Sequence, residues 1–321
     1  MSMANSPETD ARDSLEILPC LLCGGQNCRP VYQVSDRLQA RFQSGQVKEP
    51  ETYHIVACSA CGFRFLNPRP RAQDLGKYHQ GGAYGPHQRE GGGAVGVVYR
   101  LLRPFSVGYK ARQATRGLAP GDLLDVGCGT GEFLREMRRR GWQTLGIEKE
   151  EKAAQIARDS GCPVLSGDPL ETDLSNRTFD LITLWHSLEH LPDPIRVLAK
   201  LTKHLRSLGR LVIALPNPDS LDARFYRSRW AAWDAPRHLY HFRPGELERL
   251  VRQSSGEFRL IKTASLPLDP FYHALLSEIS WSHDLSVWAK AIRGSVIGLL
   301  SFFSGFAALR GSSNLYIYQK A

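Results

Sequence analysis

Residues 123–131 read Leu-Leu-Asp-Val-Gly-Cys-Gly-Thr-Gly, and this stretch decides the fold. It begins as a mostly apolar run typical of a buried strand, and residues 132–140 after it have the charge pattern of a helix. Gly127, Gly129 and Gly131 carry no side chain, so a ligand can approach the backbone closely here. The stretch therefore predicts a ligand-binding turn between a strand and a helix.

Two carboxylates accompany these glycines and indicate what the ligand is. Glu148 follows Gly131 by 17 residues, at the end of a second expected strand, where an acid can accept both hydroxyls of a ribose. Asp125 lies two residues before the first glycine, where a carboxylate would repel a pyrophosphate but suits a cationic group. We therefore expect S-adenosylmethionine, with its ammonium and sulfonium, although Asp125 also fits a structural role in a tight turn.

The surrounding sequence alternates strand and helix patterns, which predicts a parallel sheet covered on both faces. The expected strands are 123–126, 143–147, 163–165, 179–185 and 210–215, and the helices between them are 132–140, 150–160 and 194–208. After Pro216 we expect a helix at 244–253, a strand at 258–263, helical material at about 270–309 and a last strand at 314–319.

Residues 121–215 resemble a class I S-adenosylmethionine-dependent methyltransferase of the group found in sugar, lipid and secondary-metabolite biosynthesis. The resemblance lies in Asp-Val-Gly-Cys-Gly-Thr-Gly at 125–131, Gly-Ile-Glu at 146–148, Gly-Asp at 167–168, Phe-Asp-Leu-Ile-Thr-Leu-Trp-His-Ser-Leu-Glu-His-Leu at 179–191 and Gly-Arg-Leu-Val-Ile at 209–213. It implies an α/β fold with a Rossmann-like, mostly parallel seven-stranded sheet and helices on both faces.

The resemblance also implies roles for individual residues. Glycines 127, 129 and 131 would line the methionine moiety, Glu148 would hold the ribose diol, and Asp168 would meet the adenine amino group. The residue after that aspartate commonly donates its N–H to the adenine, but here it is Pro169, which has none. Either Leu170 substitutes or the contact is lost. Trp185, at the end of the fourth strand, completes the expected cofactor-binding set.

Three histidines are candidates for catalysis, because ligands bind beyond the carboxyl ends of parallel strands. His186 and His190 directly follow the fourth strand. His238 lies in residues 216–243, a segment that follows the fifth strand and that we interpret as a lid over the acceptor. Residues 224–243 hold five arginines and six aromatic residues against one aspartate, and the arginines could bind phosphate or carboxylate groups. We expect His238 to be the base; a packed structural histidine is the alternative.

Four cysteines predict a metal site in the N-terminal part. Cys20 and Cys23 form one C-x-x-C pair and Cys58 and Cys61 another, which matches a four-thiolate zinc ribbon with a structural Zn²⁺. The intervening loop is longer than usual for such a module. The pattern is similar to the N-terminal zinc module of some sugar C-methyltransferases.

These patterns divide the chain into a polar tail (1–16), a zinc-ribbon-like module (17–70), a flap and linker (71–118) that contains the glycine-rich stretch 81–96, and a methyltransferase domain (119–321). The tail has no features of a secretory or transit signal, so we expect a cytoplasmic protein. The apolar residues 294–309 are interpreted as a buried helix or a dimer interface; peripheral contact with the inner face of the membrane is the alternative.

The net charge of +9 and the lid favour an anionic or lipid-linked small molecule as acceptor: a sugar, nucleotide-sugar, lipid or natural product methylated on oxygen or carbon. An rRNA or tRNA methyltransferase is an alternative, but no long lysine-rich strip is present to track a phosphate backbone. A non-catalytic, zinc-dependent interaction protein with a degenerate methyltransferase fold is a third reading. The intact glycines, Asp125 and Glu148 argue against it.

Overall fold

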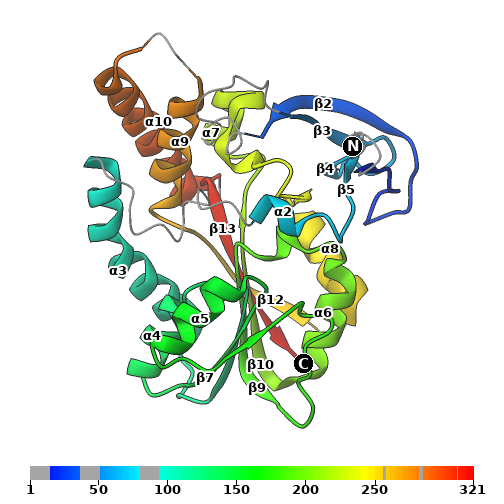
Figure 1. The fold of residues 1–321 in the computed structure, drawn as a ribbon, viewed down its shortest axis with the longest axis vertical. Coiled ribbons are helices and arrows are strands. Elements are labelled where there is room, and N and C mark those ends of the chain that lie inside the picture. Colours follow the sequence, from blue (N-terminus) through cyan, green and yellow to red (C-terminus); the bar gives the residue numbers. More distant parts are fainter. Residues whose placement is uncertain (1–14, 37–50, 80–93, 256–257, 282–284, 309) are drawn as a thin grey trace, which may run out of the picture.

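The computed structural model describes residues 15–36, 51–79, 94–255, 258–281, 285–308 and 310–321. The expected tail, up to residue 14, and most of the glycine-rich stretch lie outside these ranges. The chain forms a large α/β unit with a small sheet packed against one side (Figure 1).

A seven-stranded sheet forms the centre of the molecule, as predicted. In spatial order its strands are β12 (Phe258–Ser265), β13 (Ser313–Lys320), β10 (Leu205–Pro216), β9 (Phe179–Trp185), β6 (Asp122–Val126), β7 (Gln143–Glu148) and β8 (Val164–Ser166). The five strands from β10 to β8 pair in parallel, and β13 runs antiparallel to both of its neighbours.

Helices cover both faces of this sheet. One face packs against α3 (Ala94–Thr115), α4 (Glu132–Arg139) and α5 (Glu151–Asp159), and the other against α6 (Pro194–Lys203) and α8 (Pro244–Ser255). The helix expected at 194–208 is shorter in the structure. Because the buried Leu205 pairs with Phe179, it begins strand β10 instead of ending the helix.

The helical material before β13 is a pair of helices, α9 (Asp269–Trp281) and α10 (Val287–Ala308). They lie side by side at the upper left of Figure 1, beyond the carboxyl ends of the parallel strands. Among the described residues, Val287–Gly305 is the one stretch long and apolar enough to cross a membrane, and only 22% of it is buried.

The N-terminal module is built from short strands: β2 (Cys28–Ser35), β3 (Thr52–Cys58) and β4 (Arg64–Leu66) form a sheet, while β1 (Leu15–Glu16) pairs with β5 (Arg69–Pro70). Helix α2 (Gly76–His79) follows. The fourth strand of the sheet, β11 (Tyr240–His241), comes from the lid and pairs antiparallel with β4.

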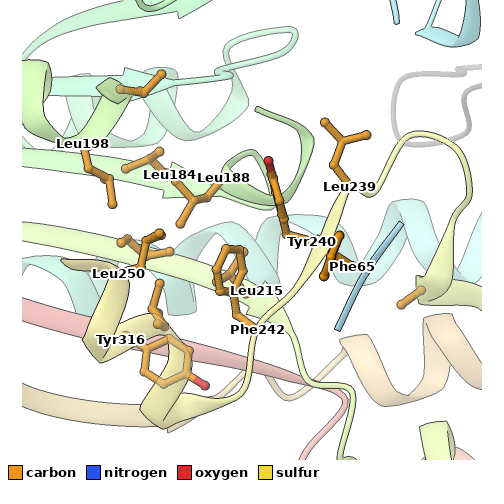
Figure 2. Close-up of a cluster of buried hydrophobic side chains, with 14 of the residues drawn as sticks. Phe65, Leu184, Leu188, Leu198, Leu215, Leu239, Tyr240, Phe242, Leu250 and Tyr316 are labelled. Carbon is orange, nitrogen blue, oxygen red and sulfur yellow. The ribbon is translucent and has the colours of Figure 1, made fainter. Parts of the chain in front are cut away.

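The module and the large unit share one hydrophobic core. Figure 2 shows Phe65 of β4 beside Tyr240 and Phe242 of the lid, continuous with Leu184 of β9 and Leu250 of α8. The lid itself consists of α7 (Leu221–Tyr226), the single turns η3 (Arg227–Arg229) and η4 (Ala231–Trp233), and β11. The lid is therefore a tightly packed element that joins the two parts of the protein.

Candidate functional site

A cavity of about 910 Å³ opens at the carboxyl ends of the parallel strands. Its walls come from the turns after β6, β7, β8 and β9, from α3, from the lid and from α9. The predicted residues that line it are Asp125, Gly127, Gly129, Glu148, Asp168, Trp185, His186, His190 and His238. Residues from five separate parts of the sequence thus meet at one site.

The glycine turn lies against the cavity in a backbone conformation that requires glycine. Gly127 has φ of 73° and Gly129 has φ of 54°. A Cβ on Gly127 would lie 2.7 Å from the Cβ of Ser187, so a side chain there would clash as well as strain the backbone. Bare backbone at these two positions leaves room for a ligand to approach the main chain.

Gly131 has a different position from its two neighbours. It does not line the cavity, and a Cβ there would lie 2.9 Å from the Cβ of Ala157 on α5. We had expected Gly131 to line the methionine moiety, but the structure places it where α4 packs closely against α5. Its lack of a side chain serves helix packing.

Glu148 stands at the end of β7 with its carboxylate held by backbone donors. The N–H of Gly129 donates to Oε2 over 2.8 Å, and the N–H of Glu150 donates to Oε1 over 2.9 Å. Burial raises the pKa of Glu148, while these two hydrogen bonds lower it. A carboxylate has about four lone-pair sites, so each oxygen keeps one for a further donor. These two free acceptor sites suit a ligand that carries two adjacent hydroxyl groups.

Asp125 ends β6 almost fully buried, and its Oδ1 accepts a 2.7 Å hydrogen bond from the hydroxyl of Thr183. Burial raises its pKa to about 7, and the hydrogen bond from Thr183 and the charge of Lys110 oppose this increase. A bound cation would favour the ionised form. A buried carboxylate of this kind therefore suits a positively charged ligand group.

Asp168 and Leu170 differ in what they can offer a ligand. Asp168 lines the cavity, and its Oδ2 lies 3.4 Å from Nζ of Lys149. The N–H of Leu170 donates to Oδ1 of Asp168 over 3.0 Å, and Leu170 does not line the cavity. The expected substitution of Leu170 for the missing N–H of Pro169 is therefore not what the structure shows.

His186 lies between two carboxylates. Its Nε2 is 3.0 Å from Oδ2 of Asp269 on α9, and its Nδ1 is 3.6 Å from Oε1 of Glu189. Burial lowers the pKa of His186, but the two carboxylates outweigh this effect and raise it to about 9. The same contacts keep the pKa values of Asp269 and Glu189 below their usual range, against the effect of burial. At neutral pH His186 is therefore a cation and a poor proton acceptor.

His238 is oriented differently, with one ring nitrogen fixed by the backbone. Its Nδ1 lies 2.7 Å from the carbonyl oxygen of Ala232, so Nδ1 carries the proton and Nε2 has a lone pair. Nε2 is 4.0 Å from Oε1 of Glu189 and 3.9 Å from Oδ2 of Asp234. This tautomer can accept a proton at Nε2.

His190 stacks edge-on against His238, with ring centroids 4.6 Å apart, and its Nδ1 lies 3.1 Å from the carbonyl oxygen of Arg237. One ligand atom from each of Glu189, His190 and His238 lies within 4.8 Å of the others, so this group could also hold a metal ion. The buried oxygens of Glu189 have no hydrogen-bond partner among the described residues.

The lid arginines do not face the cavity. None of the five lines it, and Arg237 is buried in ion pairs with Asp36 of the N-terminal module and Asp234. Arg243 pairs with Asp219 and Glu246. The cavity lining gives no support to the expectation that these arginines bind an anionic acceptor: Arg237 joins the lid to the module, and Arg243 joins the end of the lid to Asp219 and α8.

Asp269, Lys110 and Tyr272 line the cavity but were not predicted from the sequence. Asp269 lies 83 residues beyond its partner His186, at the start of a helix whose position the sequence did not fix. Nζ of Lys110 lies 5.1 Å above the ring of Trp185. An apolar run that contains a single charge, such as residues 266–276, was the one available signal for Asp269.

The four predicted cysteines also come together, at the edge of the N-terminal module. The Sγ atoms of Cys20 and Cys61 are 3.6 Å apart, those of Cys23 and Cys58 are 3.5 Å apart, and all four lie within 4.8 Å of one another. These distances are too long for disulfides. Cys28, in β2, is not part of the group.

Comparison with known proteins gives a consistent result. Residues 100–256 match a family model described as a methyltransferase domain. The chain is 27% identical over 190 residues to a ubiquinone biosynthesis O-methyltransferase of Idiomarina loihiensis, covering 55% of this chain and 77% of that one. It is 28% identical over 205 residues to the enzyme of the same name from Aromatoleum aromaticum, covering 58% and 82%.

Among solved structures, an S-adenosylmethionine-dependent methyltransferase from Mesorhizobium loti is similar, with a TM-score of 0.46 and 17% identity over 67% of this chain and 98% of that one. The family match covers the glycine turn, Glu148, all three histidines and the lid. On this match, residues 100–256 are identified as a methyltransferase domain, and the chain is similar to proteins named O-methyltransferases.

Proposed function

We propose that the protein methylates a hydroxyl oxygen of a small-molecule acceptor, with His238 as the base. The observation that carries this proposal is the fixed tautomer of His238, whose proton-accepting Nε2 belongs to a cavity-lining residue. The relatives that are named O-methyltransferases add support for oxygen as the methylated atom.

The residues around the glycine turn fit S-adenosylmethionine. Glu148 has one free acceptor site on each oxygen for the ribose hydroxyls, Asp125 suits the ammonium group, and bare backbone at Gly127 and Gly129 leaves space between them. Bound S-adenosylmethionine supplies an electrophilic methyl group on a sulfonium.

The remaining chemistry is carried out by residues of the protein. The acceptor hydroxyl would lose its proton to Nε2 of His238 as its oxygen takes the methyl group that the cofactor would supply, with S-adenosylhomocysteine as the leaving product. Glu189, 4.0 Å away, stabilises the imidazolium that forms. The His186–Asp269 pair holds α9 against the end of β9, which fixes the wall of the cavity on the acceptor side.

We also propose that the four cysteines bind a structural Zn²⁺. A tetrahedral ion with Zn–S bonds of about 2.3 Å places its sulfurs about 3.8 Å apart, close to the 3.5 and 3.6 Å separations observed. A Cβ on Gly25 would lie 3.1 Å from Sγ of Cys58, so the backbone is packed tightly around the thiolates. Four sulfur ligands leave no open position, which makes this site structural.

The test of the catalytic proposal uses labelled S-adenosylmethionine and a panel of acceptors that carry phenol, catechol, sugar hydroxyl or enolisable keto groups. Transfer to oxygen, identified by mass spectrometry of the product, is the expected result. Transfer only to carbon or nitrogen would overturn it. Binding of S-adenosylmethionine without transfer to any hydroxyl compound would leave no support for His238 as a base.

A further inference from the structure

Helix α10 presents its bulky apolar side chains to solvent and its small residues to the protein. Its inner stripe consists of Gly294, Ile297, Gly298, Ser301 and Gly305, all buried. Its outer stripe consists of Val287, Trp288, Ile292, Val296, Leu299, Leu300 and Phe303, each between 46% and 79% exposed. The usual arrangement of a surface helix is reversed.

The glycines explain why this orientation is fixed. A Cβ on Gly298 would lie 2.9 Å from Cα of Phe271, and one on Gly294 would lie 3.0 Å from Leu275. Only glycine permits α10 to lie this close to α9. Arg293 also pairs with the buried Glu278 of α9, so turning α10 around its axis would break an ion pair.

The charges of α10 and of the residues that follow it indicate what covers the outer stripe. From Leu285 to Arg310 the sequence has no acidic residue and three cations. Arg293 is neutralised by Glu278, whereas Lys290 and Arg310 form no ion pair with any described residue. An exposed apolar stripe that includes Trp288, on a helix with no acidic residue and with cations that lack an ion pair among the described residues, suits the interface of a membrane with anionic lipids.

A second copy of the chain fits this face less well. Two-fold packing of α10 on itself would bring two helices of the same positive charge together. No carboxylate in the helix could balance these charges. The chain outside the described residues offers no cover either, because residues 1–14, 37–50 and 80–93 contain no two adjacent bulky apolar residues.

Helix α9 connects this surface to the cavity. Asp269, Tyr272, His273 and Leu276 line the cavity, at the i, i+3, i+4, i+7 spacing of one helix face. Phe271 and Leu275, on another face, contact α10. Helices α10 and α9, each about 10 Å across, therefore lie between the outer stripe and the acceptor site.

We propose that the outer stripe of α10 docks on an anionic lipid surface and that the acceptor is a lipid-anchored molecule taken from that surface. The second part rests on the proposed function. The helix lies in the plane of the interface; inserting it across the membrane would carry Lys290 and the Arg293–Glu278 pair into the hydrocarbon.

The test is flotation of the full chain with vesicles of phosphatidylcholine, with and without phosphatidylglycerol. The wild type should float with the anionic vesicles at low salt, and Leu300→Ser combined with Phe303→Ser should abolish this. Ile156→Ser is the matched control, because Ile156 is 47% exposed and belongs to α5, which lies apart from α10 (Figure 1). Lys290→Gln should weaken binding about fivefold.

Two further measurements keep the outcomes separate. Vesicles should shift the tryptophan emission to the blue, and Trp288→Phe, which keeps the apolar contact, should remove most of this shift. Failure of the wild type to float, or a dimer in sedimentation that Leu300→Ser dissociates without any vesicle binding, would overturn the proposal. S-adenosylmethionine affinity, measured in the absence of vesicles, tests the methyltransferase function separately.

Discussion

Replacing Glu148 by Gln tests the cofactor site most directly, because the prediction needs no knowledge of the acceptor. In the wild type, two of the four lone-pair sites accept the N–H groups of Gly129 and Glu150, and two remain for the ribose. The amide of Gln has a single acceptor oxygen, and its NH₂ group would face one of these backbone donors. The variant therefore loses charge-assisted bonds on both the protein side and the ligand side.

The magnitude follows from this count. Two charge-assisted hydrogen bonds at about 1.5 kcal/mol each give about 3 kcal/mol, which is roughly a 100-fold increase in the Kd for S-adenosylmethionine. At a ligand concentration of about 100 times the wild-type Kd, the ligand should stabilise the wild type by about 2.7 kcal/mol and the variant by only about 0.4 kcal/mol. Without ligand the stability should change little, because the variant loses a backbone hydrogen bond but also avoids the cost of burying a charge, which raises the pKa of Glu148.

Isothermal titration with S-adenosylmethionine or S-adenosylhomocysteine, together with thermal unfolding with and without ligand, measures both quantities. Glu150→Gln is the matched control, since Glu150 lines the same cavity but touches Glu148 only through its backbone. If Glu148→Gln binds within about threefold of the wild type while the control does the same, the assignment of Glu148 to the ribose is refuted.

His238→Gln should lower turnover by about 10² to 10⁴-fold with unchanged S-adenosylmethionine affinity, because a proton acceptor is lost; an equal loss in the His241→Gln control, outside the cavity, would instead indicate a structural effect. Metal analysis should find about one zinc per chain, reduced in Cys58→Ser and kept in Cys28→Ser; equal metal in all three would contradict the four-thiolate site. The raised pKa of His186, about 9 against an ordinary 6.5, adds stability that is complete below pH 6.5 and lost as pH rises through 9. His186→Gln should therefore lack about 3 kcal/mol of this pH-dependent stability in denaturant titrations, and identical pH profiles for the two proteins would disprove the ion pair.

The elements of the fold could be predicted because their signals are local. The glycine turn, Asp125 and Glu148 lie within 24 residues of one another, on strands that the apolar pattern marks clearly. The sheet order then follows from the right-handed crossovers of alternating strands and helices. Gly131 shows a limit of this approach, because a glycine that permits close packing on Ala157 has the same sequence signal as one beside a ligand.

The contacts between residues far apart in the sequence could not be predicted. Arg237 pairs with Asp36, which lies 201 residues away in the sequence, and His186 pairs with Asp269, which lies 83 residues away. In the sequence alone, an arginine that pairs with a buried carboxylate cannot be distinguished from one that binds an anionic ligand. The orientation of α10 was also hidden, because its apolar residues fit a buried helix until the glycines show which side faces α9.

Because of strand β11, the N-terminal module cannot be transferred to another methyltransferase domain by itself. The strand belongs to the lid but completes the sheet of the module, and it begins two residues after His238. A truncated enzyme that starts after residue 70 would expose Tyr240 and would leave Arg237 with Asp234 as its one remaining carboxylate partner among the described residues. The module and the lid therefore form one packed unit, and the sequences of the two must change together.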